Sequence, residues 1–233
     1  MTQWPSPTPQ SFFQCLKFAL LTLVGPLRRL WLWVAITLIL DQFASLFVHA
    51  FKTHTDDRVM LSYGVLYIAF RLLLASVTAI AVNQAYMDEL KGEKSLLIEC
   101  FLKFLKPMVI ESSRVMASVS IGILLGVVPG IIRAVRLFWV LYIVQFDKEY
   151  DEGKVDALQR SRSLSMGRFW WSIALMMAWL ITELGTDFMM SAINPYNQPG
   201  PFVFGLALTI VVSLYTSGVL FFGYLYLERN RKR

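Results

Sequence analysis

The chain has 233 residues, of which 56% are hydrophobic and only 16% are charged, and its mean hydropathy is +0.55. These values argue against an ordinary soluble domain and favour a protein for which lipid is the solvent. The formal charge of +6 would suit a nucleic-acid-binding protein. However, the basic residues lie in short segments beside apolar runs, which is the pattern of membrane topology, so we expect no nucleic-acid partner.

The N-terminal residues 1–10, MTQWPSPTPQ, are polar and rich in proline. They contain neither a basic n-region nor a small-residue cleavage site, so we expect a polar tail and no cleaved signal peptide. The two cysteines, Cys15 and Cys100, are both predicted near the cytoplasmic face, where thiols stay reduced. A structural disulfide is therefore not expected.

Apolar runs near 20 residues recur along the chain, and a helix rising ~1.5 Å per residue needs about that length to cross a hydrocarbon layer of ~30 Å. We therefore predict an all-α fold: a single integral membrane domain with six transmembrane helices as three hairpins. The predicted spans are residues 30–50, 60–87, 109–128, 131–146, 169–190 and 202–227. Pro129 and Gly130 are predicted to form the tight turn between the third and fourth spans.

The third and fourth spans could instead form a re-entrant hairpin within residues 109–146. The fourth is short and carries Arg133 and Arg136 near its start. Removing both spans leaves every other segment on the same side of the membrane, so charge counting does not separate the two models.

The distribution of lysine and arginine predicts the orientation, because positively charged loops stay in the cytoplasm. Sixteen basic residues fall on the side of both chain ends and four on the other side. We therefore expect both termini in the cytoplasm. The tryptophans and tyrosines near the predicted span ends would be interface anchors: Trp31, Trp33, Trp170, Trp171, Tyr224 and Tyr226.

Three short segments before the odd-numbered spans are predicted to be helices in the cytoplasmic interface, at residues 11–24, 95–106 and 157–165. Ser11 and Gln14 open the first at capping-box spacing. The third has a small or apolar stripe, with Arg160 assigned to the opposite, polar face. This pattern suggests three repeats of an interfacial helix plus a hairpin, at 11–87, 95–146 and 155–227. Three unrelated surface helices are the alternative.

Ionisable residues inside predicted spans are candidate functional residues, because a charge near mid-bilayer costs about 2.5 to 3.5 kcal/mol on insertion scales. Asp41 and Arg71 lie at matching depth in the first two spans, so they could pair. Nearer the outer face, helical spacing places Arg133 and Arg136 on one side of the fourth span. In the same way, Glu183 and Asp187 share one side of the fifth span. Structural pairing is the simpler reading, and a polar path for ions or protons is the alternative.

Small residues recur every four positions at Ser118, Gly122, Gly126 and Gly130, a spacing that lets helix backbones approach closely. We expect internal packing, with self-association as the alternative. His49, His54, Asp56 and Asp57 could supply metal ligands, but their spacing matches no recognised site, so neither a metal nor another cofactor is expected. The sequence has no G-x-G-x-x-G, P-loop, H-E-x-x-H or G-x-S-x-G motif, and we expect no enzymatic activity.

Residues 124–171 contain V-V-P-G-I-I at 127–132, a short charged loop, and A-L-Q-R-S-R-S-L at 157–164 followed by Gly167 and Arg168. This stretch resembles the YciC-like bacterial inner-membrane proteins and, more distantly, the membrane domain of some glycerophosphodiester phosphodiesterases. The resemblance implies the bacterial cytoplasmic membrane as location and implies no reaction. The phosphodiesterase relatives carry catalysis in a separate soluble domain, which we expect to be absent because six residues follow the last span.

The sequence thus favours a non-enzymatic membrane scaffold or accessory subunit that acts through lipid and protein contacts, as a homo-oligomer or within a membrane complex. The alternative is a small transporter or channel that uses the intramembrane charges. Cytoplasmic leaflets commonly carry anionic lipid, and each nearby basic side chain contributes about 1 kcal/mol to binding such a surface. The predicted head-group contacts are Lys103, Lys106, Arg160, Arg162 and Arg168.

Overall fold

The computed structural model describes residues 9, 11–52, 70, 74, 77–92, 95–166, 168–191 and 199–231. Within the helices, the side chains of 12, 41–52, 187, 190, 191, 199, 201, 202 and 231 lie outside the description. All regular secondary structure in the described ranges is α-helical, which agrees with the predicted fold class.

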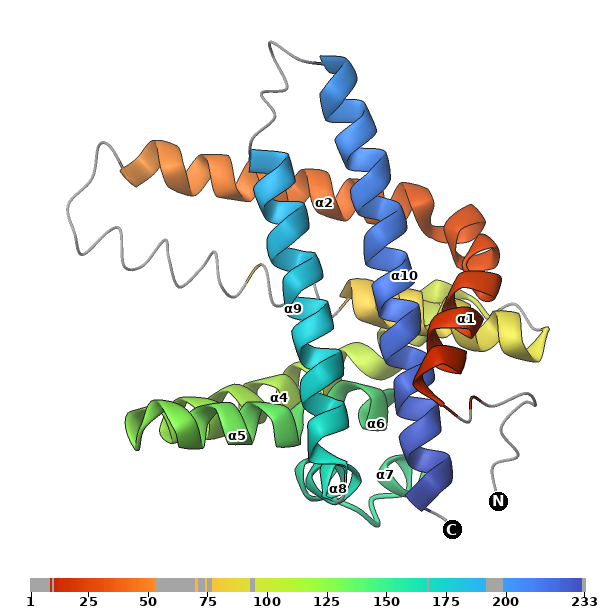
Figure 1. Cartoon of the computed structure of the whole chain (residues 1–233), viewed down its shortest axis with the longest axis vertical. Helices are drawn as coiled ribbons and strands as arrows, with labels where there is room; N and C mark the ends of the chain where they lie inside the picture. Colours follow the sequence, from red (N-terminus) through yellow and green to blue (C-terminus); the bar gives the residue numbers. More distant parts are fainter. Residues whose placement is uncertain are drawn as a thin grey trace.

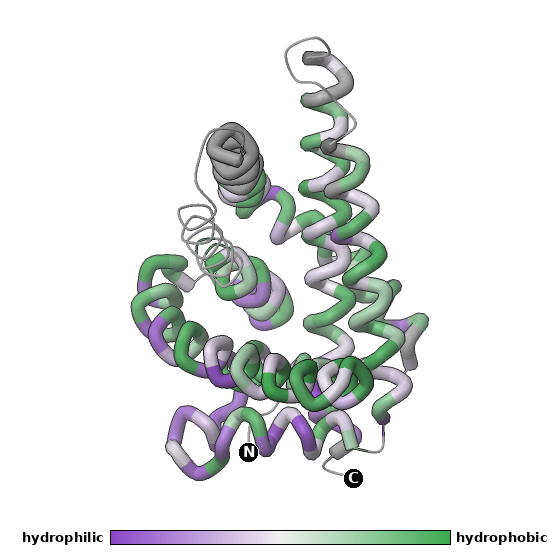
Figure 2. Tube along the Cα trace, turned by 90° about the vertical axis from the view of Figure 1, so that its left-hand side faces the viewer, coloured by the Kyte–Doolittle hydropathy of each residue, from purple (hydrophilic) through white to green (hydrophobic). Residues whose placement is uncertain are grey.

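The helices are α1 (Phe12–Thr22), α2 (Val24–Lys52), α4 (Leu97–Leu124), α5 (Val127–Leu137), α6 (Val140–Phe146), α7 (Lys148–Asp151), α8 (Ala157–Ser165), α9 (Phe169–Ser191) and α10 (Pro199–Arg231). Residues 77–91 are also helical. In Figure 1, α9 and α10 run side by side along the long axis, whereas α2 and the α4–α5 hairpin lie across it. Figure 2 shows hydrophilic residues gathered around α7 and α8, with the more apolar α9 and α10 rising from that end.

The described part contains four helical stretches long and apolar enough to cross a membrane: Leu97–Leu124, Val127–Phe146, Phe169–Thr186 and Val203–Asn230. A fifth arises if the α1–α2 pair, bent by 70° at Leu23, counts as one span. These stretches are compatible with membrane residence. The expected second span at 60–87 lies largely outside the described residues. The full set of six spans in three hairpins therefore stays a prediction.

The predicted position of the turn between the third and fourth spans is wrong by four residues. The chain turns at Leu125 and Gly126, and Pro129 and Gly130 already belong to the first turn and a half of α5. Gly126 has a φ of +142°, which only glycine adopts without strain. Pro129 suits the start of a helix, where its missing N–H would have had no partner in any case.

The separate interfacial helix expected at 95–106 is also a wrong prediction, because α4 runs unbroken through Pro107. A proline inside a helix removes one backbone hydrogen bond and commonly kinks the helix. Here the flanking side chains Phe104 and Met108 are both buried, so packing on either side of the proline favours continuation of α4. The two other short helices, α1 and α8, form as expected, and the side chain of Ser11 accepts a hydrogen bond from the backbone N–H of Gln14.

The core is built around α6, α10 and the segment at 77–91, whose largest fully buried side chains are aromatic. Tyr86 donates a hydrogen bond to the carbonyl of Leu214 at 2.8 Å. Its ring fits because residue 218 is glycine: a Cβ there would fall 2.5 Å from the Tyr86 hydroxyl. Tyr142 and Tyr224 stack with their centroids 5.5 Å apart. Tyr224 is fully buried and is therefore not the interface anchor that the sequence suggested.

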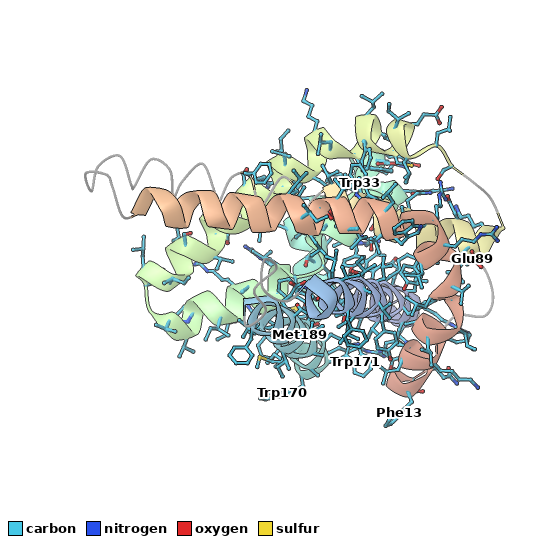
Figure 3. The ribbon with its side chains drawn as sticks, turned by 90° about the horizontal axis from the view of Figure 1, so that it is seen from above. Phe13, Trp33, Glu89, Trp170, Trp171 and Met189 are labelled. Carbon is cyan, nitrogen blue, oxygen red and sulfur yellow. The ribbon has the colours of Figure 1, made fainter. Side chains whose placement is uncertain are left out.

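The other expected anchors divide by exposure. Trp170 is 79% exposed on α9 and Trp31 is 54% exposed on α2, as an interface anchor requires. Trp33 instead lies between α2 and α4, with its ring 5.5 Å from that of Phe101, and Trp171 is half-buried (Figure 3).

Glycine spacing determines how closely α4 and α5 approach each other. A Cβ on Gly122 would lie 2.9 Å from the Cα of Gly130, so the two backbones are in direct contact. The small residues thus pack within one hairpin, which is the internal packing expected, with Gly126 at its turn.

We predict that Gly122→Ala destabilises the protein by about 1 to 3 kcal/mol, because the added methyl overlaps the α5 backbone. Gly185→Ala is the matched control: it lies in α9 with no atom within 4 Å of an added Cβ. That change should be neutral or stabilise by up to about 1 kcal/mol, since alanine favours helix. Thermal unfolding in detergent micelles measures both, and equal effects of the two changes would contradict the close contact.

Candidate functional site

The charged end of the molecule is organised by α8, and one face of this helix is buried. The buried positions are Ala157, Arg160, Ser161, Leu164 and Ser165. They follow the i, i+3, i+4, i+7, i+8 spacing of a core-facing helix stripe. The assignment of Arg160 to the polar face was therefore wrong. The same spacing, applied without assuming that an arginine faces water, would have placed it in the buried stripe.

Arg160 lies among three carboxylates, two from the α6–α7 corner and one from the end of α10. Its Nε donates to Asp147 Oδ2 at 2.7 Å, and its Nη2 lies 3.1 Å from Glu149 Oε2 and 3.5 Å from Glu228 Oε1. The side chains of Arg160, Asp147 and Glu228 are only 7%, 6% and 4% exposed. We call these four residues the Arg160 node. A planar guanidinium with five donors can serve several acceptors at once, which a lysine could not do in this geometry.

Asp147 joins the Arg160 node to the local backbone. One carboxylate oxygen binds Arg160, and the other accepts from the N–H of Glu149 at 2.9 Å, which caps the start of α7. The same residue ends α6. One side chain therefore fixes both the chain reversal after α6 and the position of the buried arginine.

Ser161, next to Arg160, provides hydrogen-bond partners for backbone groups at the break between α5 and α6. Its hydroxyl donates to the carbonyl of Arg136 at 2.8 Å and accepts from the N–H of Trp139 at 3.3 Å. These backbone groups lie where the regular helix is interrupted at residues 138 and 139. The indole N–H of Trp139 donates in turn to Ser172 at 2.9 Å. The polar groups at the break between α5 and α6 thus find hydrogen-bond partners in side chains of α8 and α9.

A second ionic group ties α4 to the loop before α8. The Arg114 guanidinium contacts Glu111 Oε2 at 2.8 Å and Asp156 Oδ1 at 2.7 Å. Asp156 also caps α8 by accepting from the N–H of Gln159 at 3.0 Å. Burial alone would raise the pKa of Asp156, but these hydrogen bonds outweigh it and the pKa is lowered.

A third ionic group, remote from α8, links the start of α2 to the end of the segment at 77–91. Arg29 donates to Asp88 and to the carbonyl of Ser95, while the N–H of Ser95 and the side chain of Gln84 donate to the same carboxylate. Burial would raise the pKa of Asp88, yet these donors lower it overall. Beside this group, the carboxylate of Glu89 lies against Gly25, where an added Cβ would overlap it. Glu89 is labelled in Figure 3.

One uncharged polar contact in the core was not foreseen. Asn83 Nδ2 donates to Gln145 Oε1 at 3.2 Å, and Gln145 Nε2 donates to the carbonyl of Ile80 at 3.1 Å. Both side chains are buried. Single polar residues in apolar runs carry little sequence signal, and only their spatial pairing identifies them.

The structure places only some of the predicted intramembrane charges. Arg133 donates to the carbonyl of Ser118 at 2.9 Å, inside the α4–α5 hairpin, and Arg136 is exposed. Glu183 is half-buried on α9. The side chains of Asp41, Arg71 and Asp187 lie outside the described residues, and the two predicted ion-pair sets stay predictions.

The candidate metal ligands of the first outer loop, His49, His54, Asp56 and Asp57, also lie outside the described side chains. Among the side chains that are described, no group of three or more His, Cys, Asp or Glu residues is placed to hold a metal ion. Cys15 and Cys100 are both buried and free.

The predicted head-group residues differ in their availability. Arg160 is enclosed by carboxylates and cannot reach a lipid head group without breaking the Arg160 node. Lys103 is 59% exposed and pairs with Asp151 at 2.9 Å. Lys106 and Arg162 are exposed, and the Arg168 guanidinium lies 4.9 Å from the ring centre of Tyr226. The exposed basic surface is therefore narrower than the sequence suggested.

No family model, curated protein sequence or solved structure matches the chain. The functional argument consequently depends on the chemistry of the structure. In that respect the stretch 124–171 is informative, because it builds α5 to α8 and supplies three members of the Arg160 node.

We predict that Arg160→Met lowers the free energy of unfolding by about 3 to 5 kcal/mol, because it leaves buried carboxylates without their counter-charge. Adding Asp147→Asn and Glu228→Gln should restore part of that loss. Lys154→Gln, which breaks the exposed Lys154–Glu152 pair, is the control and should cost under about 1 kcal/mol. Equal losses for Arg160→Met and Lys154→Gln, measured by chemical denaturation in micelles, would rule out a stabilising Arg160 node.

The lowered pKa of Asp88 predicts an acid-dependent contribution to stability. A carboxyl group whose pKa is depressed on folding stabilises the protein above its unfolded pKa of ~3.9, and that contribution is lost as the pH falls through the folded value. Asp88→Asn should therefore destabilise the protein at neutral pH, and the difference from wild type should shrink below about pH 4. Unfolding temperatures measured across this range test the sign. A difference that grows on acidification would contradict it.

Proposed function

We propose that this chain is a non-enzymatic scaffold or accessory subunit of the bacterial cytoplasmic membrane, with both termini in the cytoplasm. Sixteen basic residues on one side, the apolar helices and the resemblance of residues 124–171 to YciC-like proteins support the location and the orientation. The proposed role is to hold lipid and protein contacts at the cytoplasmic face, either as a homo-oligomer or within a membrane complex.

The observation that carries this proposal is the Arg160 node. It joins α8 to the α6–α7 corner and to the end of α10, and its buried donors and acceptors are directed at one another. The groups around Arg114 and Arg29 do the same for α4 and α2. Charges used in this way make a rigid frame. In a transport path, by contrast, charges have to face a substrate.

Lipid head groups are the partner class that the remaining basic surface fits best. Arg162 is exposed on α8, and Arg168 follows it at the start of α9, held above Tyr226. α8 and the end of α10 lie at the same end of the molecule (Figure 1). Arginine binds phosphate oxygens with two parallel hydrogen bonds, so this surface suits an anionic lipid.

We predict that anionic lipid raises the thermal stability of the wild type more than that of the double variant Arg162→Gln with Arg168→Gln. The loss should be about 2 kcal/mol of lipid-dependent stabilisation, since each basic residue near such a surface contributes about 1 kcal/mol. Lys148→Gln with Lys154→Gln removes the same charge from exposed positions and is the control. The measurement compares unfolding in micelles with added anionic or zwitterionic lipid.

Equal stabilisation of wild type and the Arg162 and Arg168 variant would contradict a specific lipid surface. The transporter alternative predicts a different result in proteoliposomes, namely ion flux that depends on Arg133 and Glu183. Such a flux would overturn the scaffold proposal.

A further inference from the structure

The tip of the α4–α5 hairpin exposes a cluster of apolar side chains, in addition to Ile98 and Leu102 near the start of α4. Leu124 is 86% exposed and Leu125 is 70% exposed. The side chains around them are also more than half exposed: Ile121, Ile123, Val127, Val128 and Ile131. By contrast α6, which continues α5, is buried almost throughout. The apolar surface that is exposed and would be removed from water by lipid or protein therefore ends before α6 begins.

The base of the hairpin is fixed to the charged end of the molecule on both arms. On the α4 arm, Arg114 binds Asp156, which lies in the charged loop and is 39% exposed. On the α5 arm, the carbonyl of Arg136 accepts from Ser161 of α8. Both arms consequently begin at the level of the hydrophilic loop and α8, and only the residues between Arg114 and Arg136 project from it.

The projecting part is too short to cross a bilayer. From Arg114 to Leu125 the α4 arm rises about 16 Å, and from Val127 to Arg136 the α5 arm rises about 14 Å, at 1.5 Å per residue. The hydrocarbon layer is ~30 Å thick, so each arm matches about one leaflet. The hairpin can reach the middle of the bilayer at most.

A full crossing would also place charges in lipid. In Val127–Phe146, read as one span of 20 residues, the exposed Arg136 falls at the tenth position. In the last 20 residues of α4, Glu111 would fall at the seventh position and Arg114 at the tenth. A charge at that depth is costly, whereas at the head groups it costs little. Figure 1 agrees, since the hairpin lies across the direction of α9 and α10 and does not run beside them.

Within the hairpin, the remaining polar groups are compatible with one leaflet. The Arg133 guanidinium is directed at the Ser118 carbonyl, so its charge is partly satisfied inside the hairpin. The close contact of Gly122 with Gly130 makes the tip narrow. A narrow apolar tip above a charged base has the form of a wedge.

We propose that the α4–α5 hairpin is a re-entrant wedge that inserts into the acyl chains of the leaflet beside α8 and does not reach the opposite head groups. The apolar tip contacts lipid acyl chains, and Arg114 and Arg136 lie at the level of the head groups. This inference is independent of the scaffold role, because it concerns only how the hairpin meets the bilayer.

The test places single cysteines in a full chain carrying Cys15→Ala and Cys100→Ala. Leu125→Cys marks the tip and Leu102→Cys, 80% exposed on the first half of α4, is the matched control. Glu152→Cys marks the charged loop, and Gly200→Cys, where an added Cβ meets no atom, marks the start of α10. Each variant is treated with a membrane-impermeant thiol reagent from either side, and then with a small permeable fluorophore in vesicles containing nitroxide lipids.

We expect the tip cysteine to be protected from the impermeant reagent on both sides, while Glu152→Cys and Gly200→Cys react from opposite sides. The fluorophore at the tip should be quenched more by a nitroxide on the acyl chain than by one on the head group, and the order should reverse at Leu102→Cys. Reaction of the tip from either side would overturn the wedge. Protection without quenching by either nitroxide would also overturn it, because the tip would then be covered by protein, as in contact with a second copy.

Discussion

A single buried guanidinium holds the charged end of this protein together. Arg160 needs acceptors wherever it is removed from water, and Asp147, Glu149 and Glu228 supply them from the α6–α7 corner and from α10. Because Glu228 is 68 residues from Arg160 in the sequence, this contact forms only when α8 lies against the end of α10. The caps of α7 and α8, the break between α5 and α6, and the base of the α4–α5 hairpin are all arranged around that helix.

Above this charged end, contacts between helix backbones become the main constraint. Hydrophobic burial does little to hold helices together in lipid, so close packing and a few hydrogen bonds carry that role. Gly122 against the Gly130 backbone is one such contact, and Gly218 against the Tyr86 ring is a close contact of backbone with side chain. An added methyl group would overlap the neighbour at both glycines. The hydrogen bond between Asn83 and Gln145 favours one relative position of their two helices. Apolar side chains alone would make the packing less specific.

The sequence predicted the features that depend on local periodicity and missed those that depend on tertiary contact. Helix type, the Ser11 cap and the internal packing of the small residues were predictable, because each follows from neighbouring positions along one helix. The buried state of Arg160 was missed because an arginine was assumed to face water, although the spacing of α8 places it in the buried stripe. Its acidic partners cannot be located from spacing, since Glu228 is 68 residues away. The turn was placed at Pro129 and Gly130 because that dipeptide favours turns, but Gly126 four residues earlier could adopt the positive φ and leave the proline inside α5.

The hydroxyl of Ser161 at the break between α5 and α6 has a consequence for the order in which the chain can mature. The carbonyl of Arg136 receives this hydroxyl from 25 residues further along the sequence. During synthesis, therefore, α5 and α6 exist before the group that satisfies their junction has been made. Until α8 emerges and docks, water or a lipid head group has to solvate that carbonyl. The hydrogen bonding of the α5–α6 junction is thus complete only once α8 has docked.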